Sequence, residues 1–250
     1  MHTKVELFGL DIAALTFDQA TQALAQAAAG HDGAARIVVT PNVDHIVRLE
    51  SNPDFKARYA QADFIFADGM PVVWASRLVG RPLPERVTGA DLFVALCKRA
   101  QAEDWQVAVL GGDARIEDEI RQGFARSFPG LRVEILSPSM QYDPDGPEAR
   151  EHARRIRELA PRVVFVCLGM PKQEKWALRY APTLPGGIIL CAGMAMMFAI
   201  GMQRRAPLWM QRSGLEWLWR MGSEPRRMVR RYLVEDVKFL GLFWREWRRR

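Results

Sequence analysis

The stretch that decides the fold is residues 63–91, which read DFIFADGMPVVWASRLVGRPLPERVTGAD. Its apolar run at 64–67 predicts a buried strand, and Asp68 follows at the end of that strand, directly before a Gly-Met-Pro turn. Pro71 suits the first turn of a helix. Open parallel sheets bind ligands outside the carboxyl ends of their strands, so Asp68 is a candidate general base. The alternative is that Asp68 only caps the helix.

The second half of this stretch adds a cation and another helix start. Arg86 and the Thr88-Gly89 pair precede a predicted helix at 90–102. The amino ends of helices favour anions, because their backbone N–H groups are unpaired and the helix dipole is positive there. A carboxylate, a guanidinium and two helix starts so close together predict a site for a phosphorylated substrate.

Working outward, apolar runs and helical periodicity alternate along the chain. Strands are predicted at 5–10, 36–39, 106–110, 131–136, 162–168 and 187–191. Helices are predicted at 17–29, 43–50, 53–61, 114–128, 148–159 and 172–180, with a short one after Gly193. This alternation is typical of an α/β fold with a mainly parallel, doubly wound sheet and helices on both faces.

Four predicted strands end in polar turns. The turns are TPN at 40–42, DG at 68–69, GGD at 111–113 and GMPKQE at 169–174. In a parallel sheet these ends lie on one edge, so Gly111, Asp113 and Glu174 join the candidate binding residues for a nucleotide-like ligand. Neither GxGxxG nor GxxxxGKS occurs, which disfavours an ordinary NAD or ATP site. The alternative is that each turn only closes a tight strand-to-helix connection.

Composition predicts a cytosolic protein with a sizeable core. Of the 250 residues, 49% are hydrophobic, and the three cysteines are scattered through apolar runs, as expected of reduced thiols. The four histidines form no ligand cluster, and the amino end resembles no signal peptide. Residues 180–203 carry no charge and are long enough to span a bilayer. Their prolines and glycines favour a buried strand and a short helix instead.

The basic charge is concentrated in the last 50 residues. Residues 201–250 hold 13 Lys and Arg against 5 Asp and Glu, whereas residues 1–200 hold 22 against 24. Five of the eight tryptophans also lie there. We therefore expect an α/β catalytic core at 1–200 and a basic, Trp-rich helical appendage at 201–250.

Two helices are predicted in this appendage, at 207–221 and 225–249, with Ser223 capping the second. The second carries an apolar stripe at helical spacing, formed by Val229, Leu233, Val237, Leu240, Trp244 and Trp247. Tryptophans on one face and arginines on the others favour a helix that lies in the interface of an anionic membrane. The alternatives are a basic nucleic-acid arm, or a stripe that packs on the protein's own core or on a partner subunit.

Several motifs together resemble one known family. They are TPNVDH at 40–45, ADGMP at 67–71, RVTGADL at 86–92, GGD at 111–113, GMPKQE at 169–174, and RAPLW, GLEWLWR, EPRR and RY between 205 and 232. In this order and over nearly the whole chain, they resemble the WecG/TagA/CpsF glycosyltransferases, the N-acetylmannosaminyltransferase-like enzymes of glycosyltransferase family 26. The family often has an acidic residue where this chain has Ala199, which leaves the donor sugar open.

The resemblance implies an inverting, metal-independent transferase without a cofactor, built on the family's own α/β fold. Such enzymes move a hexose from a UDP-sugar to a sugar linked to undecaprenyl diphosphate, in the synthesis of teichoic acid, common antigen, capsule or exopolysaccharide. N-acetylmannosamine, its uronate, glucose and other hexoses all stay open as the donated sugar. The implied location is cytoplasmic, peripheral on the inner face of the bacterial cell membrane.

The resemblance also assigns roles to residues. Asp68 matches the catalytic base, and Thr40 the substrate-contacting residue, with Asn42 beside it. Arg86 and Gln173 match further residues of the pocket. In the appendage, Arg220, Arg227 and Arg230 match arginines that reach over the active site.

Two other classes of function stay open beside the transferase. One is a soluble enzyme that modifies nucleotide sugars on the same kind of sheet. The other is a membrane- or nucleic-acid-binding α/β module without transferase activity, in which the basic appendage makes the contact. For the transferase we expect membrane contact through the C-terminal helices and no nucleic acid, and a homo-oligomer stays open.

Overall fold

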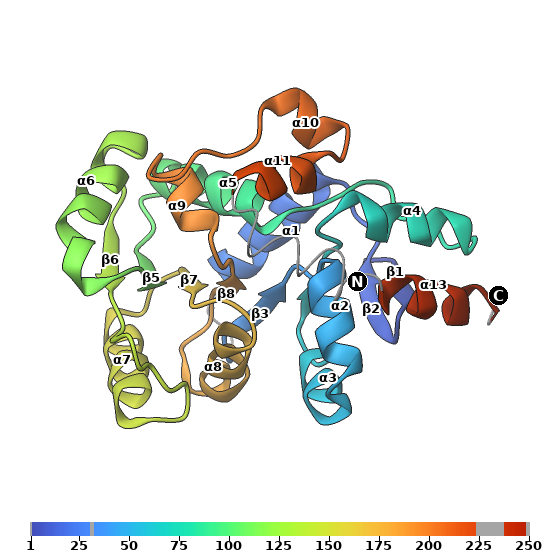
Figure 1. Ribbon diagram of the computed structural model, residues 1–250. Helices are drawn as coiled ribbons and strands as arrows, with labels where there is room; N and C mark the ends of the chain where they lie inside the picture. The colour runs from blue at the N-terminus through green and yellow to red at the C-terminus, as the bar shows by residue number, and fades with distance from the viewer. Residues whose placement is uncertain (1, 31–32, 224–237, 249–250) are drawn as a thin grey trace.

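The computed structural model describes residues 2–30, 33–223 and 238–248. Within these residues a six-stranded, all-parallel sheet forms the centre, in the order β4-β3-β8-β7-β5-β6 (Figure 1). Its strands are β3 (Arg36–Val39), β4 (Phe64–Ile65), β5 (Val107–Gly111), β6 (Val133–Leu136), β7 (Val163–Cys167) and β8 (Ile188–Cys191). The predicted parallel α/β sheet is confirmed.

Helices cover both faces of this sheet. One face carries α1 (Phe17–Ala29), α5 (Gly89–Ala102), α6 (Glu117–Ser127) and α9 (Ala195–Ala199). The other carries α2 (Val43–Glu50), α3 (Pro53–Tyr59), α7 (Pro147–Leu159) and α8 (Lys172–Tyr180). Side chains alternate between the two layers, as in β5, where Val107 and Val109 pack on one face and Ala108 and Leu110 on the other. The apolar runs of the sequence are therefore strands buried on both sides.

Local signals place many helix boundaries where the sequence predicts them. Thr16 caps α1 through its hydroxyl, which accepts a hydrogen bond from the backbone N–H of Gln19 at 3.3 Å. Asn52 caps α3 in the same way, by accepting from the N–H of Phe55 at 3.1 Å. The helix predicted at 114–128 begins as a 3-10 turn, Ala114–Ile116, before α6.

The single strand predicted at 5–10 is wrong. The structure has a hairpin there, in which β1 (Lys4–Leu7) pairs antiparallel with β2 (Leu10–Ala13) outside the main sheet. Phe8 and Gly9 form the turn with φ of 55° and 71°. Alternating apolar residues continue through both strands, and Phe8 is not a residue type that signals a left-handed turn, so the pattern concealed the reversal.

The prediction of one helix at 207–221 is also wrong, because the structure has two shorter helices there. The structure has α10 (Leu208–Arg212) and α11 (Glu216–Ser223), separated at Gly214, which has a φ of 76°. Gly214 lies so close to α4 (Met70–Leu78) that a Cβ there would meet the side chain of Met70 at 2.8 Å. A glycine is needed both for the left-handed backbone and for this close approach.

The uncharged residues 180–203 form the predicted buried strand and helix, β8 and α9. Among the residues that the structure describes, none of the helices is both long enough and apolar enough to cross a membrane. The second appendage helix is described only as α13 (Lys238–Arg248), and the predicted stripe residues Val229, Leu233 and Val237 lie outside the described residues.

Helix α13 packs beside α2 and the β1–β2 hairpin (Figure 1). Buried Phe239 contacts the ring of Phe8, with 5.1 Å between the ring centres. The remaining stripe residues Leu240, Trp244 and Trp247 are exposed. Helix α13 thus has one apolar face on the core and a second that is turned to solvent.

Candidate functional site

Asp68 is held at the end of β4 by backbone hydrogen bonds. Its N–H donates to the carbonyl oxygen of Pro41 at 3.0 Å, which ties the chain after β4 to the chain after β3. One of its carboxylate oxygens accepts from the N–H of Gly89, the first residue of α5, at 3.3 Å. Gly69 follows with a φ of 127°, a conformation that L side chains rarely adopt. The half-buried carboxylate is therefore fixed from both sides.

Thr40 lies at the same point of the sheet edge. It is buried, and a Cβ added at Gly89 would meet its hydroxyl oxygen at 2.9 Å. The ends of β3 and β4 and the start of α5 therefore converge, and they bring Thr40, Asp68 and Gly89 together. Asn42 lies two residues further and caps α2, where its side-chain oxygen accepts from the N–H of His45 at 3.1 Å. Its predicted catalytic role stays a prediction.

Arg86 lies on the segment that runs beside Asp68. The next residue, Val87, donates its N–H to the carbonyl oxygen of Ala67 at 3.0 Å. The guanidinium of Arg86 is 3.3 Å from a carboxylate oxygen of Glu216, at the start of α11 in the appendage. The predicted phosphate-binding cation is thus paired with a carboxylate of the protein in this structure.

The ion-pair network also contains three residues that were not predicted as site residues, namely Glu216, Arg205 and Asp91. Arg205 is 3.4 Å from the second carboxylate oxygen of Glu216 and 2.5 Å from Asp91. Asp91 also accepts from the hydroxyl of Thr88 at 2.7 Å. Burial raises the pKa of Asp91, but the hydrogen bonds from Arg205 and Thr88 outweigh it and hold that pKa below its ordinary value. Arg205, Glu216 and Asp91 all lie within motifs that carry the family resemblance, and those motifs were the signal that could have indicated them.

Gln173 connects two loops at the middle of the sheet edge. Its side-chain oxygen accepts from the N–H of Gly169, after β7, at 3.1 Å and from the N–H of Gly193, after β8, at 2.9 Å. Its amide donates to Glu174 at 2.9 Å. Both side chains are buried, so Gln173 holds the two loops together. The predicted contact of Gln173 and Glu174 with substrate stays a prediction.

Glu174 is a buried carboxyl group with an incomplete set of partners. It is 1% exposed, and its Oε2 atom has no hydrogen-bond partner in the described part of the chain. Burial raises the pKa of Glu174 to about 7, although the hydrogen bond from Gln173 lowers it. This group therefore changes charge near neutral pH.

The GGD turn lies well away from Asp68. Strands β3, β8 and β7 separate β4 from β5, and four strand spacings correspond to about 19 Å. Gly111 fits closely against β7, since a Cβ there would meet Cβ of Cys167 at 2.6 Å. Asp113 begins the 3-10 turn and binds Arg115 at 2.6 Å, and these hydrogen bonds lower the pKa of Asp113 to about 2. Their predicted role in substrate binding stays a prediction.

The three predicted appendage arginines cannot be placed at the site. Arg220 lies on α11, but its side chain lies outside the described part, and Arg227 and Arg230 are outside the described residues altogether.

An Asp-x-Asp sequence, Asp143-Pro144-Asp145, lies in the connection between β6 and α7. Asp143 accepts from the N–H of Asp145 at 3.0 Å, and Asp145 forms an ion pair with Arg179 at 2.5 Å. Within the described ranges, no group of three or more His, Cys, Asp or Glu side chains could hold a metal ion. Metal independence stays a prediction.

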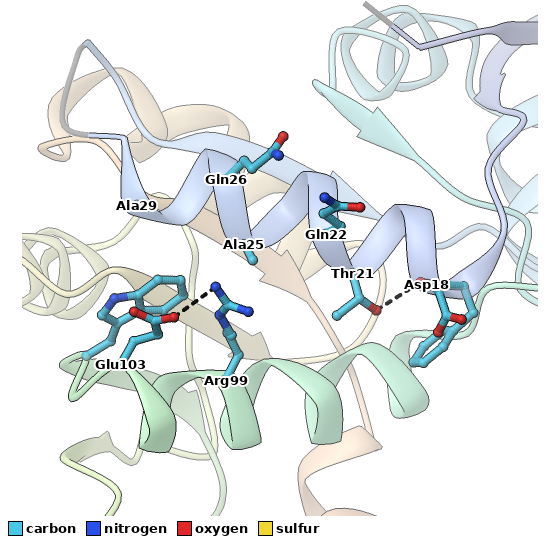
Figure 2. Close-up of a pocket in the computed structure, with 10 residues that line it drawn as sticks. Asp18, Thr21, Gln22, Ala25, Gln26, Ala29, Arg99 and Glu103 are labelled. Atoms are coloured by element: carbon cyan, nitrogen blue, oxygen red, sulfur yellow. Dashed lines mark hydrogen bonds and ion pairs between the residues drawn. The ribbon is translucent and has the colours of Figure 1, made fainter.

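A surface pocket of about 530 Å³ lies elsewhere, between α1 and α5 (Figure 2). Apolar groups such as Ala25 and Trp105 line it, and Arg99 and Glu103 form an ion pair across its wall at 2.8 Å. It contains none of the predicted site residues. The predicted site residues that the structure describes therefore lie at the sheet edge and not at this pocket.

Comparison with known proteins finds a matching family and similar proteins. A sequence model of the glycosyl transferase WecG/TagA/CpsF family matches residues 5–250. The chain is 34% identical over 193 residues to the N-acetylglucosaminyldiphosphoundecaprenol N-acetyl-beta-D-mannosaminyltransferase of Bacillus spizizenii, covering 77% of this chain and 73% of that protein. It is 24% identical over 204 residues to the protein of the same description in Staphylococcus aureus NCTC 8325, covering 82% and 78%.

Proposed function

The chain belongs to the WecG/TagA/CpsF family of glycosyltransferases, and on this premise we propose that it moves a hexose from a UDP-sugar to a sugar linked to undecaprenyl diphosphate. The two relatives are named for transfer of N-acetylmannosamine onto N-acetylglucosaminyl-diphosphoundecaprenol. N-acetylmannosamine is therefore the first donor to test, followed by its uronate, glucose and other hexoses. The product would be a precursor of teichoic acid or another bacterial surface polysaccharide.

The observation that carries this proposal is the convergence of Asp68, Thr40 and the start of α5 at one point of the sheet edge. In the proposed reaction, Asp68 takes the proton of the acceptor hydroxyl. The hydroxyl oxygen then forms a bond to the anomeric carbon, while the bond from that carbon to the donor phosphate breaks. The electron pair of the broken bond leaves on UDP, and attack from the opposite side inverts the anomeric centre.

Positive charge is needed where the leaving diphosphate develops negative charge. Arg86 supplies a planar guanidinium that can bind two phosphate oxygens at once. Arg86 precedes Val87, whose N–H binds the carbonyl oxygen of Ala67 beside Asp68. A cation near the base is the arrangement that transfer requires. We assign no metal ion or cofactor to this step, and Arg220, Arg227 and Arg230 are proposed to add charge from the appendage.

The appendage is proposed to serve the lipid-linked substrate. The acceptor's lipid lies in the membrane, whereas its sugar and diphosphate lie at the surface. Exposed Trp244 and Trp247 suit a helix that inserts into the interface, at the inner face of the cell membrane. Docking would bring the appendage over the sheet edge as a lid.

The test is a panel of UDP-sugars supplied to the full chain with a lipid-diphosphate-linked N-acetylglucosamine acceptor. We expect transfer from one donor, with inversion seen in the product by NMR. Absence of transfer from every donor, while the protein still binds anionic vesicles, would favour the binding module without transferase activity.

A further inference from the structure

One carboxylate of the appendage lies between two arginines at the sheet edge. The two oxygens of Glu216 are divided between Arg86 at 3.3 Å and Arg205 at 3.4 Å. Arg205 also pairs with Asp91, which lies in the first turn of α5. The network therefore joins residues that are more than 100 positions apart in the chain.

Three of these four charged side chains are largely removed from water. The side chains of Arg86, Arg205 and Glu216 are 15%, 17% and 13% exposed. A guanidinium so far from bulk water needs an anion beside it, because an unpaired buried charge is costly. Among the described side chains of this network, two arginines balance Asp91 and Glu216, so loss of Glu216 leaves one excess positive charge there. An anion from outside could then replace the carboxylate.

We propose that Arg86 and Arg205 together form a subsite for a phosphate of the diphosphate substrate, and that the Glu216 carboxylate occupies this subsite until the phosphate displaces it. The oxygens of Glu216 mark where two phosphate oxygens bind. A guanidinium group can bind two oxygens side by side, whether they belong to a carboxylate or to a phosphate. The choice of a diphosphate rests on the proposed function, and the subsite adds Arg205 to its binding residues.

The location of this subsite suits transfer. Arg86 is followed directly by Val87, whose N–H binds the carbonyl oxygen of Ala67, and Gly89 binds the carboxylate of Asp68. A phosphate between Arg86 and Arg205 therefore lies beside the backbone that holds the candidate base. The donor and acceptor both carry a diphosphate, so either can be the source.

The appendage can release Glu216 at small cost to the core. Glu216 is the first residue of α11 and follows the turn at Gly214. The next two side chains, Trp217 and Leu218, are exposed. Turning the Glu216 side chain away from Arg86 therefore uncovers no buried group at 217–218, and local rearrangements of this kind are the least costly.

The test measures binding of two probes, UDP and farnesyl diphosphate, to the full chain by calorimetry. Glu216→Gln removes the competing charge and keeps the side-chain size. We expect about tenfold tighter binding of at least one probe, because the phosphate no longer has to displace a charged carboxylate from the two arginines. A gain with UDP alone assigns the subsite to the donor, and a gain with farnesyl diphosphate alone assigns it to the acceptor.

Two further variants make the result specific. Adding Arg205→Gln to Glu216→Gln should abolish the gain. The matched control is Glu246→Gln, which breaks another ion pair between appendage and core, that of Glu246 with Arg81 at 3.0 Å, and should leave both affinities unchanged.

If folded Glu216→Gln binds both probes no more tightly than the unaltered chain, the ion pairs are structural and the subsite is refuted. The proposed function is judged separately by transfer. Turnover by the unaltered chain beside unchanged affinities in Glu216→Gln would overturn only the subsite. Tighter UDP binding without any transfer would support the subsite and contradict the proposed reaction.

Discussion

The sheet edge and the appendage are assembled by different interactions. At the edge, backbone hydrogen bonds place the chemistry, as between Asp68 and both Pro41 and Gly89. In the appendage, side-chain ion pairs such as that of Arg86 with Glu216 help attach the helices to the core, beside apolar contacts such as that of Phe239 with Phe8. Backbone bonds in a buried fold rarely exchange partners, whereas an ion pair can exchange one anion for another. The comparison indicates a sheet edge that is held by backbone hydrogen bonds and an appendage that is held in part by exchangeable ion pairs.

The largest effect is expected at the rigid edge. Asp68→Asn keeps the shape and the hydrogen-bond acceptor for Gly89 but removes the base, so turnover should fall on the order of 10²- to 10⁴-fold. Binding of UDP and the melting temperature should change little. Asp63→Asn is a suitable control, because Asp63 binds the N–H of Ile37 at 2.8 Å and should affect stability more than turnover. Unchanged turnover in Asp68→Asn would remove Asp68 from the mechanism.

The second effect concerns the buried carboxyl group at the same edge. The pKa of Glu174 in the fold is about 7, above its ordinary value of 4.5, because of burial. A raised pKa favours the protonated fold, so this contribution to stability is complete below about pH 4.5 and is lost as pH rises through about 7. The Gln side chain in Glu174→Gln cannot ionise, so this variant should not lose stability in this way as pH rises.

The measurement is denaturant unfolding of both proteins at about pH 4.5 and pH 8. The unfolding free energy of the unaltered chain should fall relative to Glu174→Gln by up to about 3 kcal/mol, since one pKa unit corresponds to about 1.4 kcal/mol. An equal change of the unfolding free energy in the two proteins between these pH values would show that Glu174 keeps one charge state throughout this range.

A smaller effect is expected on the appendage. Trp244 and Trp247 are 48% and 43% exposed, so replacing both with Ser should leave the melting temperature nearly unchanged. Partitioning onto phosphatidylglycerol vesicles should fall about tenfold, because apolar interfacial contact is lost. Phe239→Ala is the opposite control, since Phe239 packs on Phe8 and should lower stability instead. Unchanged partitioning of the double variant would place membrane contact elsewhere.

The smallest effect is expected from removal of metal ions. The Asp-x-Asp at 143–145 is engaged with its own turn and with Arg179 on α8. Treatment with EDTA should therefore leave transfer unchanged. Loss of activity in EDTA that returns with Mg²⁺ or Mn²⁺ would contradict an edge that relies on arginines.

Much of the core was predictable because its signals are local. The cap at Thr16 and the helix to Ala29 depend on neighbouring residues, and so does the helix at 172–180. The hairpin turn at Phe8-Gly9 was not predicted, because a strand pattern continues through it. The division of the first appendage helix at Gly214 depends on contact with Met70, more than 100 residues away.

The sequence by itself determined the parallel α/β order, the position of Asp68 at a strand end and the basic appendage, since periodicity, turn residues and charge are all read along the chain. Only the tertiary structure decided that Gln173 holds two loops and that Glu216 lies between Arg86 and Arg205. These contacts join segments brought together by packing, and no local pattern encodes which distant carboxylate meets which guanidinium.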